Sequence, residues 1–116
     1  MSSAVDDDEA ARARMFVLMG WSNMKKLGEG GMGAAYRVTG RDGTYRVIKV
    51  NKRDREGDPA QELVEEGETL RGLRHPNIAQ LYDMTMTKSG VAILNMEYCP
   101  GGDLFRRRLV CLDLGT

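Results

Sequence analysis

Three sets of residues in this chain could together bind a phosphorylated ligand. The run Gly28-Glu29-Gly30-Gly31-Met32-Gly33 contains four glycines within six residues. Because glycine has no Cβ, its backbone can approach an anion closely and turn its N–H groups toward it. Lys49 supplies a mobile positive charge that can pair with phosphate oxygens, and Glu66 could hold that charge in place. A glycine run of this kind also occurs in dinucleotide-binding folds, so the residues around it must decide what the loop does.

The glycine run lies between two segments with the pattern of β-strands. Residues 24–27 lead into it, residues 34–39 lead out of it, and Asp42-Gly43 then predicts a tight turn. Residues 44–50 form a third predicted strand. Its alternation divides the side chains between two faces, with Tyr45, Val47 and Lys49 on one face and Arg46, Ile48 and Val50 on the other.

A helix is predicted after the polar segment 51–58. Pro59 suits its first turn and Asp58 its N-cap. Apolar or small residues recur at helical spacing and form a stripe made of Ala60, Leu63, Val64, Gly67, Leu70 and Leu73. Glu66 lies on or beside this stripe, where a carboxylate needs a partner of opposite charge. A glycine such as Gly67 costs about 1 kcal/mol relative to alanine inside a helix, so this helix depends on its packing partners.

Two further strands are predicted at residues 78–86 and 91–98, with a turn at 87–90 between them. The order of elements is strand, strand, strand, helix, strand, strand, and the hairpin connections imply antiparallel pairing. We therefore expect an α+β fold with a five-stranded antiparallel sheet and one main helix. Pro100-Gly101-Gly102 then breaks the chain before a short helix that begins near Asp103.

The charge balance gives no support for binding to nucleic acid or to a membrane surface. The chain has 17 basic and 17 acidic residues, whereas both kinds of partner need a basic surplus or patch. None of its apolar runs approaches the roughly 18 residues of a membrane-spanning helix. With the two cysteines, Cys99 and Cys111, interpreted as reduced thiols, we expect a soluble cytoplasmic protein.

The length of 116 residues suits one small domain with one modest core. Residues 1–22 are predicted to form a flexible N-terminal extension, and residues 23–116 the domain itself. Within the extension, residues 1–14 are polar and charged, so we expect disorder there. Residues 15–21 fit either an extra strand or a short helix packed on the domain, and both alternatives stay open.

With these elements in place, the chain resembles the N-terminal lobe of a protein kinase over roughly residues 23–108. Gly28-x-Gly30-x-x-Gly33 is similar to the glycine-rich loop over the ATP phosphates, and Arg46-Val47-Ile48-Lys49 to the strand that carries the family's lysine. Glu66 matches the glutamate of the kinase helix C, ten residues before Pro76. The gatekeeper and hinge of the family are similar to Asn95-Met96-Glu97-Tyr98-Cys99. The overall likeness favours the serine/threonine type, especially in the stretch Gly101-Gly102-Asp103-Leu104-Phe105.

The resemblance implies an ATP site. Lys49 would position the phosphates, and Glu66 would pair with Lys49 in the active state. Met96 matches the gatekeeper, and backbone groups of Glu97 and Cys99 would hold the adenine edge. Asp103 would either accept a hydrogen bond from a ribose hydroxyl or cap the following helix, and both alternatives stay open. The other nucleotide-binding positions that the resemblance implies are Leu27, Gly28, Glu29, Gly30, Gly31, Met32, Gly33, Ala35 and Val47.

Two of these positions depart from the family's usual pattern. Ala35 stands where the family usually has valine, and Val47 stands where it usually has alanine. Both positions pack on the adenine in relatives, so a small and a large side chain have changed places. Because volume-conserving exchanges are the tolerated kind in a core, we expect the pocket still to admit adenine.

The motifs that complete phosphoryl transfer in the family are not in these 116 residues. The family uses an aspartate of an H-R-D-x-x-x-x-N loop, and it holds Mg²⁺ through that loop's asparagine and a D-F-G aspartate. His75 is the only histidine, so no H-R-D motif is present. Asp113-Leu114-Gly115 follows Asp103 too soon to take the place of D-F-G. Mg²⁺ is therefore expected for the family, but without its protein ligands here.

We accordingly expect the ATP-binding portion of a serine/threonine-type protein kinase, truncated and inactive alone. The alternative is a non-catalytic kinase-like lobe that acts as a regulatory or interaction module. Leu70 and Leu81 match positions that contact the large lobe in the family. With that lobe absent from these residues, we expect the lower sheet face and the hinge to expose an apolar face that could bind a kinase or another protein.

Overall fold

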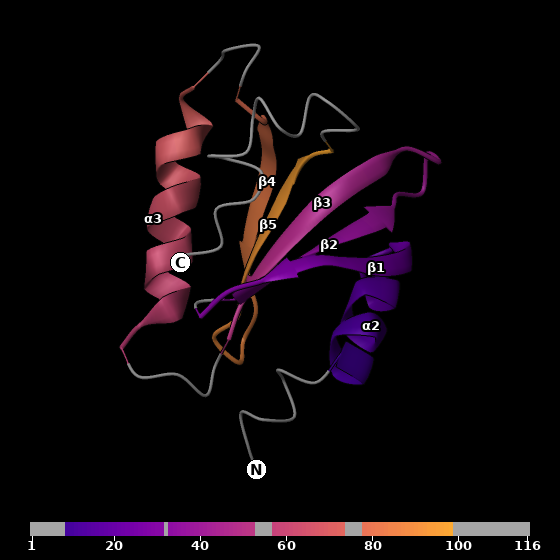
Figure 1. The fold of residues 1–116 in the computed structure, drawn as a ribbon, viewed down its shortest axis with the longest axis horizontal. Coiled ribbons are helices and arrows are strands. Elements are labelled where there is room, and N and C mark those ends of the chain that lie inside the picture. The colour runs from indigo at the N-terminus through magenta and orange to yellow at the C-terminus, as the bar shows by residue number, and fades with distance from the viewer. Residues whose placement is uncertain (1–8, 32, 53–56, 74–77, 99–116) are drawn as a thin grey trace.

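A five-stranded antiparallel sheet forms the centre of the molecule (Figure 1). The computed structural model describes residues 9–31, 33–52, 57–73 and 78–98. The strand order is β1-β2-β3-β5-β4, and every neighbouring pair is antiparallel. The predicted α+β fold is confirmed. Its elements are α2 (Glu9–Leu18), β1 (Ser22–Glu29), β2 (Gly33–Thr39), β3 (Tyr45–Asn51), α3 (Pro59–Arg71), β4 (Leu81–Met86) and β5 (Ala92–Glu97).

The hairpin between β2 and β3 sets the register at the centre of the sheet. Gly43 has a φ of 85°, in the left-handed region that glycine adopts readily. Asp42 Oδ1 accepts hydrogen bonds from the backbone N–H of Thr44 at 3.0 Å and from its hydroxyl at 2.7 Å. These bonds hold the pKa of the Asp42 carboxyl below its usual value. The resulting register places Ala35 opposite Lys49.

Helix α3 begins where the sequence predicts because its first turn is capped. The Asp58 side chain accepts a hydrogen bond from the backbone N–H of Gln61 at 3.1 Å, and Pro59 occupies the first turn, where its missing N–H is not needed. A Cβ built on Gly67 would lie 2.5 Å from Met84 Sδ. This glycine therefore lets α3 approach β4 closely, which offsets its low helix propensity.

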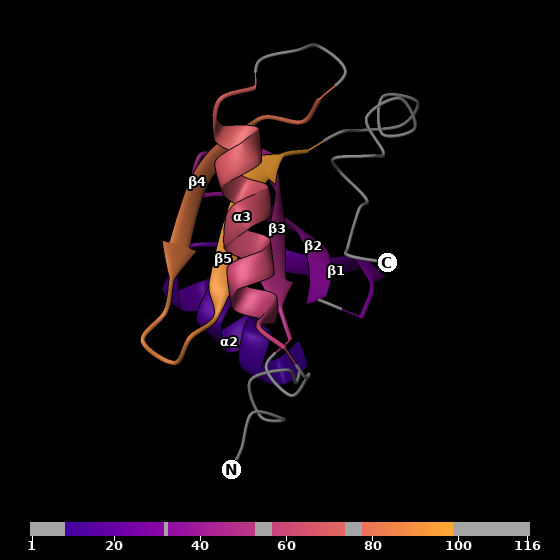
Figure 2. The same ribbon diagram turned by 90° about the vertical axis from the view of Figure 1, so that its left-hand side faces the viewer.

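The sheet has an apolar core on each face, and the two helices lie on opposite faces (Figure 2). Helix α3 covers the face that we call the inner face, with the buried core residues Ala35, Val47, Leu63, Leu70, Ala79, Ala92, Leu94 and Met96. Helix α2 packs on the opposite, outer face, with the buried core residues Phe16, Ala34, Tyr36, Val38, Ile48, Val50, Val91 and Ile93. The alternation predicted for residues 44–50 is thereby confirmed, since Val47 belongs to the inner core and Ile48 to the outer core.

Helix α2 decides between the two alternatives for residues 15–21. Residues 15–18 are helical, and the helix begins at Glu9, so the prediction of disorder is wrong for residues 9–14. Phe16 is 1% exposed, and its ring meets the rings of Trp21 and Tyr36 edge-on, with centroids 5.7 and 5.5 Å away. Arg12 is buried and donates a 2.8 Å hydrogen bond to the Tyr36 hydroxyl. Long-range contacts therefore order a segment whose local sequence is polar.

Leu70 and Leu81, which match positions that contact the large lobe in the family, both pack against the inner core. Leu70 is 6% exposed because it packs into the inner core, and Leu81 is partly buried against the same core. Several predictions concern residues outside the described part of the chain, namely Met32, Cys99, Asp103 and the short helix after Asp103. No helix in the described part of the chain is long and apolar enough to cross a membrane.

Replacement of Phe16 by alanine tests the packing of α2. We expect Phe16→Ala to lower the free energy of unfolding by about 3–5 kcal/mol, because it removes a buried aromatic ring and leaves a cavity. The matched control is Leu18→Ala, since Leu18 lies in the same helix but is 83% exposed. Urea denaturation followed by circular dichroism measures both. Equal effects of the two substitutions would show that α2 does not stabilise the sheet.

Candidate nucleotide-binding site

The glycine run makes the turn from β1 into β2. The backbone N–H of Gly30 donates to the carbonyl of Gly33 at 2.8 Å and closes this turn. A Cβ built on Gly33 would lie 2.0 Å from the carbonyl oxygen of Val50 in β3, whereas one on Gly31 would meet nothing within 4 Å. Gly33 is therefore needed for the strands to pack, quite apart from any ligand. Gly31 leaves its backbone open to approach from outside.

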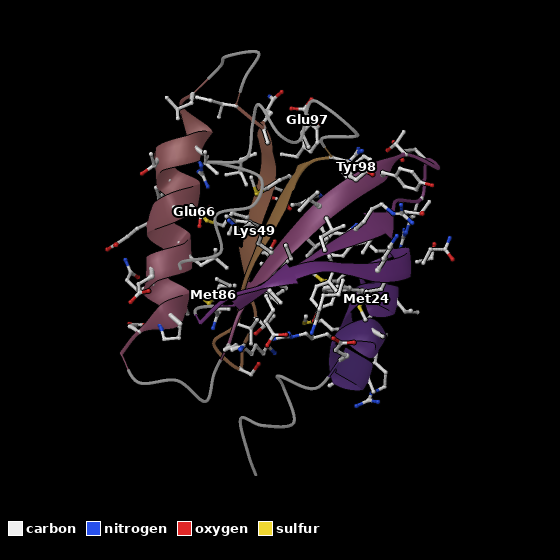
Figure 3. The ribbon with its side chains drawn as sticks, in the orientation of Figure 1. Met24, Lys49, Glu66, Met86, Glu97 and Tyr98 are labelled. Atoms are coloured by element: carbon white, nitrogen blue, oxygen red, sulfur yellow. The ribbon has the colours of Figure 1, made fainter. Side chains whose placement is uncertain are left out.

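Lys49 and Glu66 meet between the sheet and α3 (Figure 3). Lys49 Nζ donates to Glu66 Oε2 at 2.5 Å, from the middle of β3 to the middle of α3. The Lys49 side chain is 1% exposed and the Glu66 side chain 22% exposed. A buried ammonium group is costly unless a carboxylate compensates it, so this pair fixes the distance between helix and strand. The structure thus brings together the two residues that the sequence analysis expected to pair.

The apolar positions expected around adenine share the inner face with Lys49. Ala35 and Val47 are buried in the inner core, and Val47 lies opposite Met96 of β5. Leu27 of β1 is partly buried against the same core. Because Ala35 is the register partner of Lys49, the small side chain lies beside the lysine that the resemblance assigns to the phosphates.

The end of β5 is anchored through Glu97. Its backbone N–H donates to the carbonyl of Gln80 at 2.8 Å, and its side-chain Oε1 accepts from the N–H of Gln80 at 3.1 Å. The next residue, Tyr98, packs edge-on against Tyr45 with ring centroids 5.3 Å apart. The Arg37 guanidinium in turn lies 4.5 Å from the centroid of the Tyr45 ring. Glu97 and Tyr98 are thus positioned by side-chain contacts just before Cys99, which lies outside the described residues (Figure 3).

A chain of ion pairs that the sequence did not reveal links the glycine run to α2 and β3. Glu29 binds Lys26 Nζ at 2.6 Å and Lys52 Nζ at 2.7 Å, and Lys26 also binds Glu9 of α2 at 2.5 Å. The hydrogen bond from Lys26, followed by that from Lys52, lowers the pKa of the Glu29 carboxyl to about 2. The hydrogen bonds to Glu29 and Glu9 raise the pKa of Lys26 above its usual value. An irregularity in pairing between Lys26 and Gly28 contributes to this arrangement, and sequence periodicity cannot predict it.

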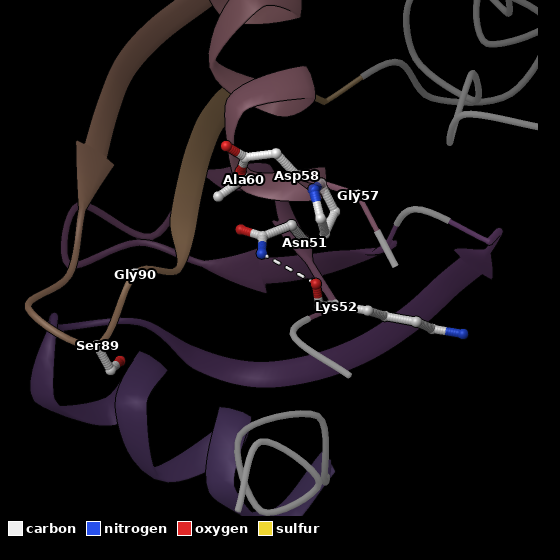
Figure 4. Close-up of a pocket in the computed structure, with 8 residues that line it drawn as sticks. Asn51, Lys52, Gly57, Asp58, Ala60, Ser89 and Gly90 are labelled. Atoms are coloured by element: carbon white, nitrogen blue, oxygen red, sulfur yellow. Dashed lines mark hydrogen bonds between the residues drawn. The ribbon is translucent and has the colours of Figure 1, made fainter. Parts of the chain in front are cut away.

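A separate polar cavity of about 250 Å³ lies at the N-terminal end of α3 (Figure 4). Asn51 lines it, yet its side chain is already engaged: Oδ1 accepts from the N–H of Ala92 at 2.6 Å, and Nδ2 donates to the carbonyl of Lys52 at 3.1 Å. Asn51 therefore ties the end of β3 to the start of β5. The described residues also contain no cluster of three or more histidine, cysteine or acidic side chains that could hold a metal ion.

A small antiparallel sheet with a glycine turn, and a lysine paired to a glutamate of the covering helix, is the arrangement of a kinase small lobe. The family model for the protein kinase domain matches residues 21–110. The chain therefore belongs to the protein kinase family.

Similarity to individual protein kinases agrees with this assignment. The chain is 40% identical over 86 residues to the serine/threonine-protein kinase Nek1 of Mus musculus, across 72% of the chain. It is 32% identical over 92 residues to the serine/threonine-protein kinase ULK3 of Rattus norvegicus, across 77% of the chain. It is also 34% identical over 87 residues to a hormonally up-regulated neu tumor-associated kinase homolog of Xenopus laevis, across 72% of the chain. The matched segments span only 7%, 19% and 12% of these relatives.

Alanine at two glycine positions separates packing from ligand binding. We expect Gly33→Ala to lower the free energy of unfolding by about 1–3 kcal/mol, because the new Cβ collides with the backbone of Val50. Gly31→Ala should change it by less than about 0.5 kcal/mol, since the space around Gly31 is open. Urea denaturation without ligand measures both. If Gly33→Ala were as stable as Gly31→Ala, the close crossing of the strands would be disproved.

Proposed function

We propose that this chain is the ATP-binding portion of a serine/threonine-type protein kinase. The observation that carries the proposal is the buried 2.5 Å ion pair between Lys49 and Glu66 on the face that also holds Ala35, Val47 and Met96. The serine/threonine type rests on the similarity of the chain to serine/threonine-protein kinases. The cytoplasm is the proposed compartment on the basis of the sequence alone.

Different residues of the proposed site would contact the phosphates and the adenine of the nucleotide. Glu66 would keep the Lys49 ammonium directed along the inner face, where it could pair with phosphate oxygens. The open backbone of Gly31 in the glycine turn would offer its N–H group to the same phosphates. Leu27, Ala35, Val47 and Met96 would form the apolar surround of adenine, and backbone groups of Glu97 and Cys99 its polar edge. When bound, ATP would supply the phosphoryl group that the family transfers to protein hydroxyls.

A second candidate function is a non-catalytic module that binds a kinase or another protein. It is favoured by three large exposed side chains near β4 and the end of α3, Leu73, Tyr82 and Met86, which are 40%, 49% and 49% exposed. The two candidates differ in whether the chain binds ATP.

Thermal unfolding with and without ATP tests the proposal. At an ATP concentration about tenfold above Kd, binding should stabilise the fold by about 1.4 kcal/mol, a shift of roughly 5 °C in Tm. Lys49→Met should abolish this shift, because it removes the phosphate-binding charge while keeping a long side chain in the core. Lys88→Met is the matched control, since Lys88 lies in the exposed turn between β4 and β5.

Circular dichroism of Lys49→Met checks that the fold survives. Should this variant unfold, Glu66→Gln takes its place, with a weakened ATP shift as the expected result. No shift of the unaltered chain at millimolar ATP would reject nucleotide binding and favour the interaction module.

The 116-residue chain by itself is expected to show no phosphoryl transfer. The aspartate that serves the substrate hydroxyl in the family belongs to a motif that these residues do not contain. Highly purified chain, MgATP labelled at the γ-phosphate and a generic protein substrate provide the assay, with Lys49→Met as background. Transfer that is present in the unaltered chain and lost in Lys49→Met would contradict the expectation.

A further inference from the structure

We infer that Glu29 is a positioning residue that braces the glycine turn from the outer face of the sheet. The inference rests on the proposed function, because its consequence for ATP depends on the turn covering the phosphates. The carboxylate of Glu29 lies at the end of β1, immediately before the turn that Gly30 and Gly33 close. Its two lysine partners come from different strands, Lys26 from β1 and Lys52 from the residue after β3.

The sheet register places this network on the outer face. Glu29 is the register partner of Ala34, and directly opposed residues share a face. Ala34 and Val50 are both in the outer core, and Lys52 follows Val50 by two residues, which returns its side chain toward the same face. Figure 4 shows the Lys52 side chain extending away from the side chain of Asn51. Glu9 approaches from α2, which packs on that face.

The ion pair between Glu29 and Lys52 spans the strand between them. In the order β1-β2-β3 a contact from the end of β1 to the end of β3 must cross the start of β2. The two β2 residues at this crossing are Gly33 and Ala34, and Ala34 lies opposite both Glu29 and Val50. Because neither residue has a large side chain, the long side chains of Glu29 and Lys52 can meet above them. The incoming arm of the turn is thereby tied to β3, the strand that carries Lys49.

This link has a direct consequence for the nucleotide site. Lys49 and the glycine turn are separate parts of the site, and both must hold their positions when phosphate binds. The Glu29 contacts fix one relative to the other without occupying the inner face, where Ala35 lies beside Lys49. Lys26 extends the brace to α2 through Glu9. Loss of the Glu29 charge should therefore loosen the turn and weaken ATP binding while the core stays packed.

Two measurements on Glu29→Gln test the inference. The first is hydrogen exchange at the Gly30 amide, which donates within the turn; the second is the Kd for MgATP by calorimetry. We expect faster exchange at Gly30 and a Kd about two- to fivefold higher, the size that partly exposed ion pairs produce. Glu68→Gln is the matched control, because Glu68 is an exposed glutamate of α3 that pairs with Arg71 at 3.9 Å. Lys52→Gln should reproduce the effect of Glu29→Gln, and the double variant should add little to either.

The outcomes separate this inference from the proposed function. The inferred role of Glu29 is wrong if Glu29→Gln leaves the rate of hydrogen exchange at Gly30 unchanged, or changes it no more than Glu68→Gln does. This holds even if ATP binds normally. If the unaltered chain binds no ATP, the proposed function and the predicted effect on ATP both fail, and exchange at Gly30 still decides whether Glu29 holds the turn. Should Glu29→Gln fail to fold, Lys52→Gln provides the same test, because it leaves the pair between Glu29 and Lys26 intact.

Discussion

The buried ion pair between Lys49 and Glu66 is the constraint on which the rest of the structure depends. An ammonium group that is 1% exposed must be compensated, and Glu66 is the carboxylate that α3 brings to it. The helix must therefore lie at one depth and one rotation against β3. Gly67 makes this possible, since its missing side chain leaves room for Met84 at the point where helix and sheet approach. Packing and charge thus specify the same position of α3.

The two faces of the sheet differ in where they carry charged residues. The inner face combines a small apolar surface with one buried charge pair, and the proposed nucleotide site lies on it. The outer face is apolar beneath α2 and charged at its margin, where Glu9, Lys26, Glu29 and Lys52 follow one another. These outer ion pairs contribute little to overall stability, because their side chains are 26% to 51% exposed. Their effect is local and concerns where the glycine turn lies.

The features of the fold that could be predicted from the sequence are those that depend on residues close together in the chain. The start of α3 follows from Asp58 and Pro59, and the faces of β3 follow from its alternation, because each depends on neighbouring residues only. Helix α2 could not be predicted in the same way, since its order depends on Phe16 reaching Trp21 and Tyr36. The contacts of Glu29 likewise depend on the irregular pairing near Lys26 and on a partner 23 positions away in the sequence, Lys52. Such contacts exist only once the sheet has formed.

The residues in and just after the glycine turn are small for different physical reasons. Gly31 is open and suits close approach by a ligand, whereas Gly33 is small because the backbone of Val50 occupies the place of its Cβ. Ala34 is small where an ion pair crosses above it, and Ala35 is small beside Lys49 on the opposite face. A glycine-rich pattern read alone cannot separate these causes, because each removes a side chain. The link to phosphate comes from the proposed role of the Lys49–Glu66 pair, whereas the crossing at Gly33 would be required even in a lobe that bound no phosphate.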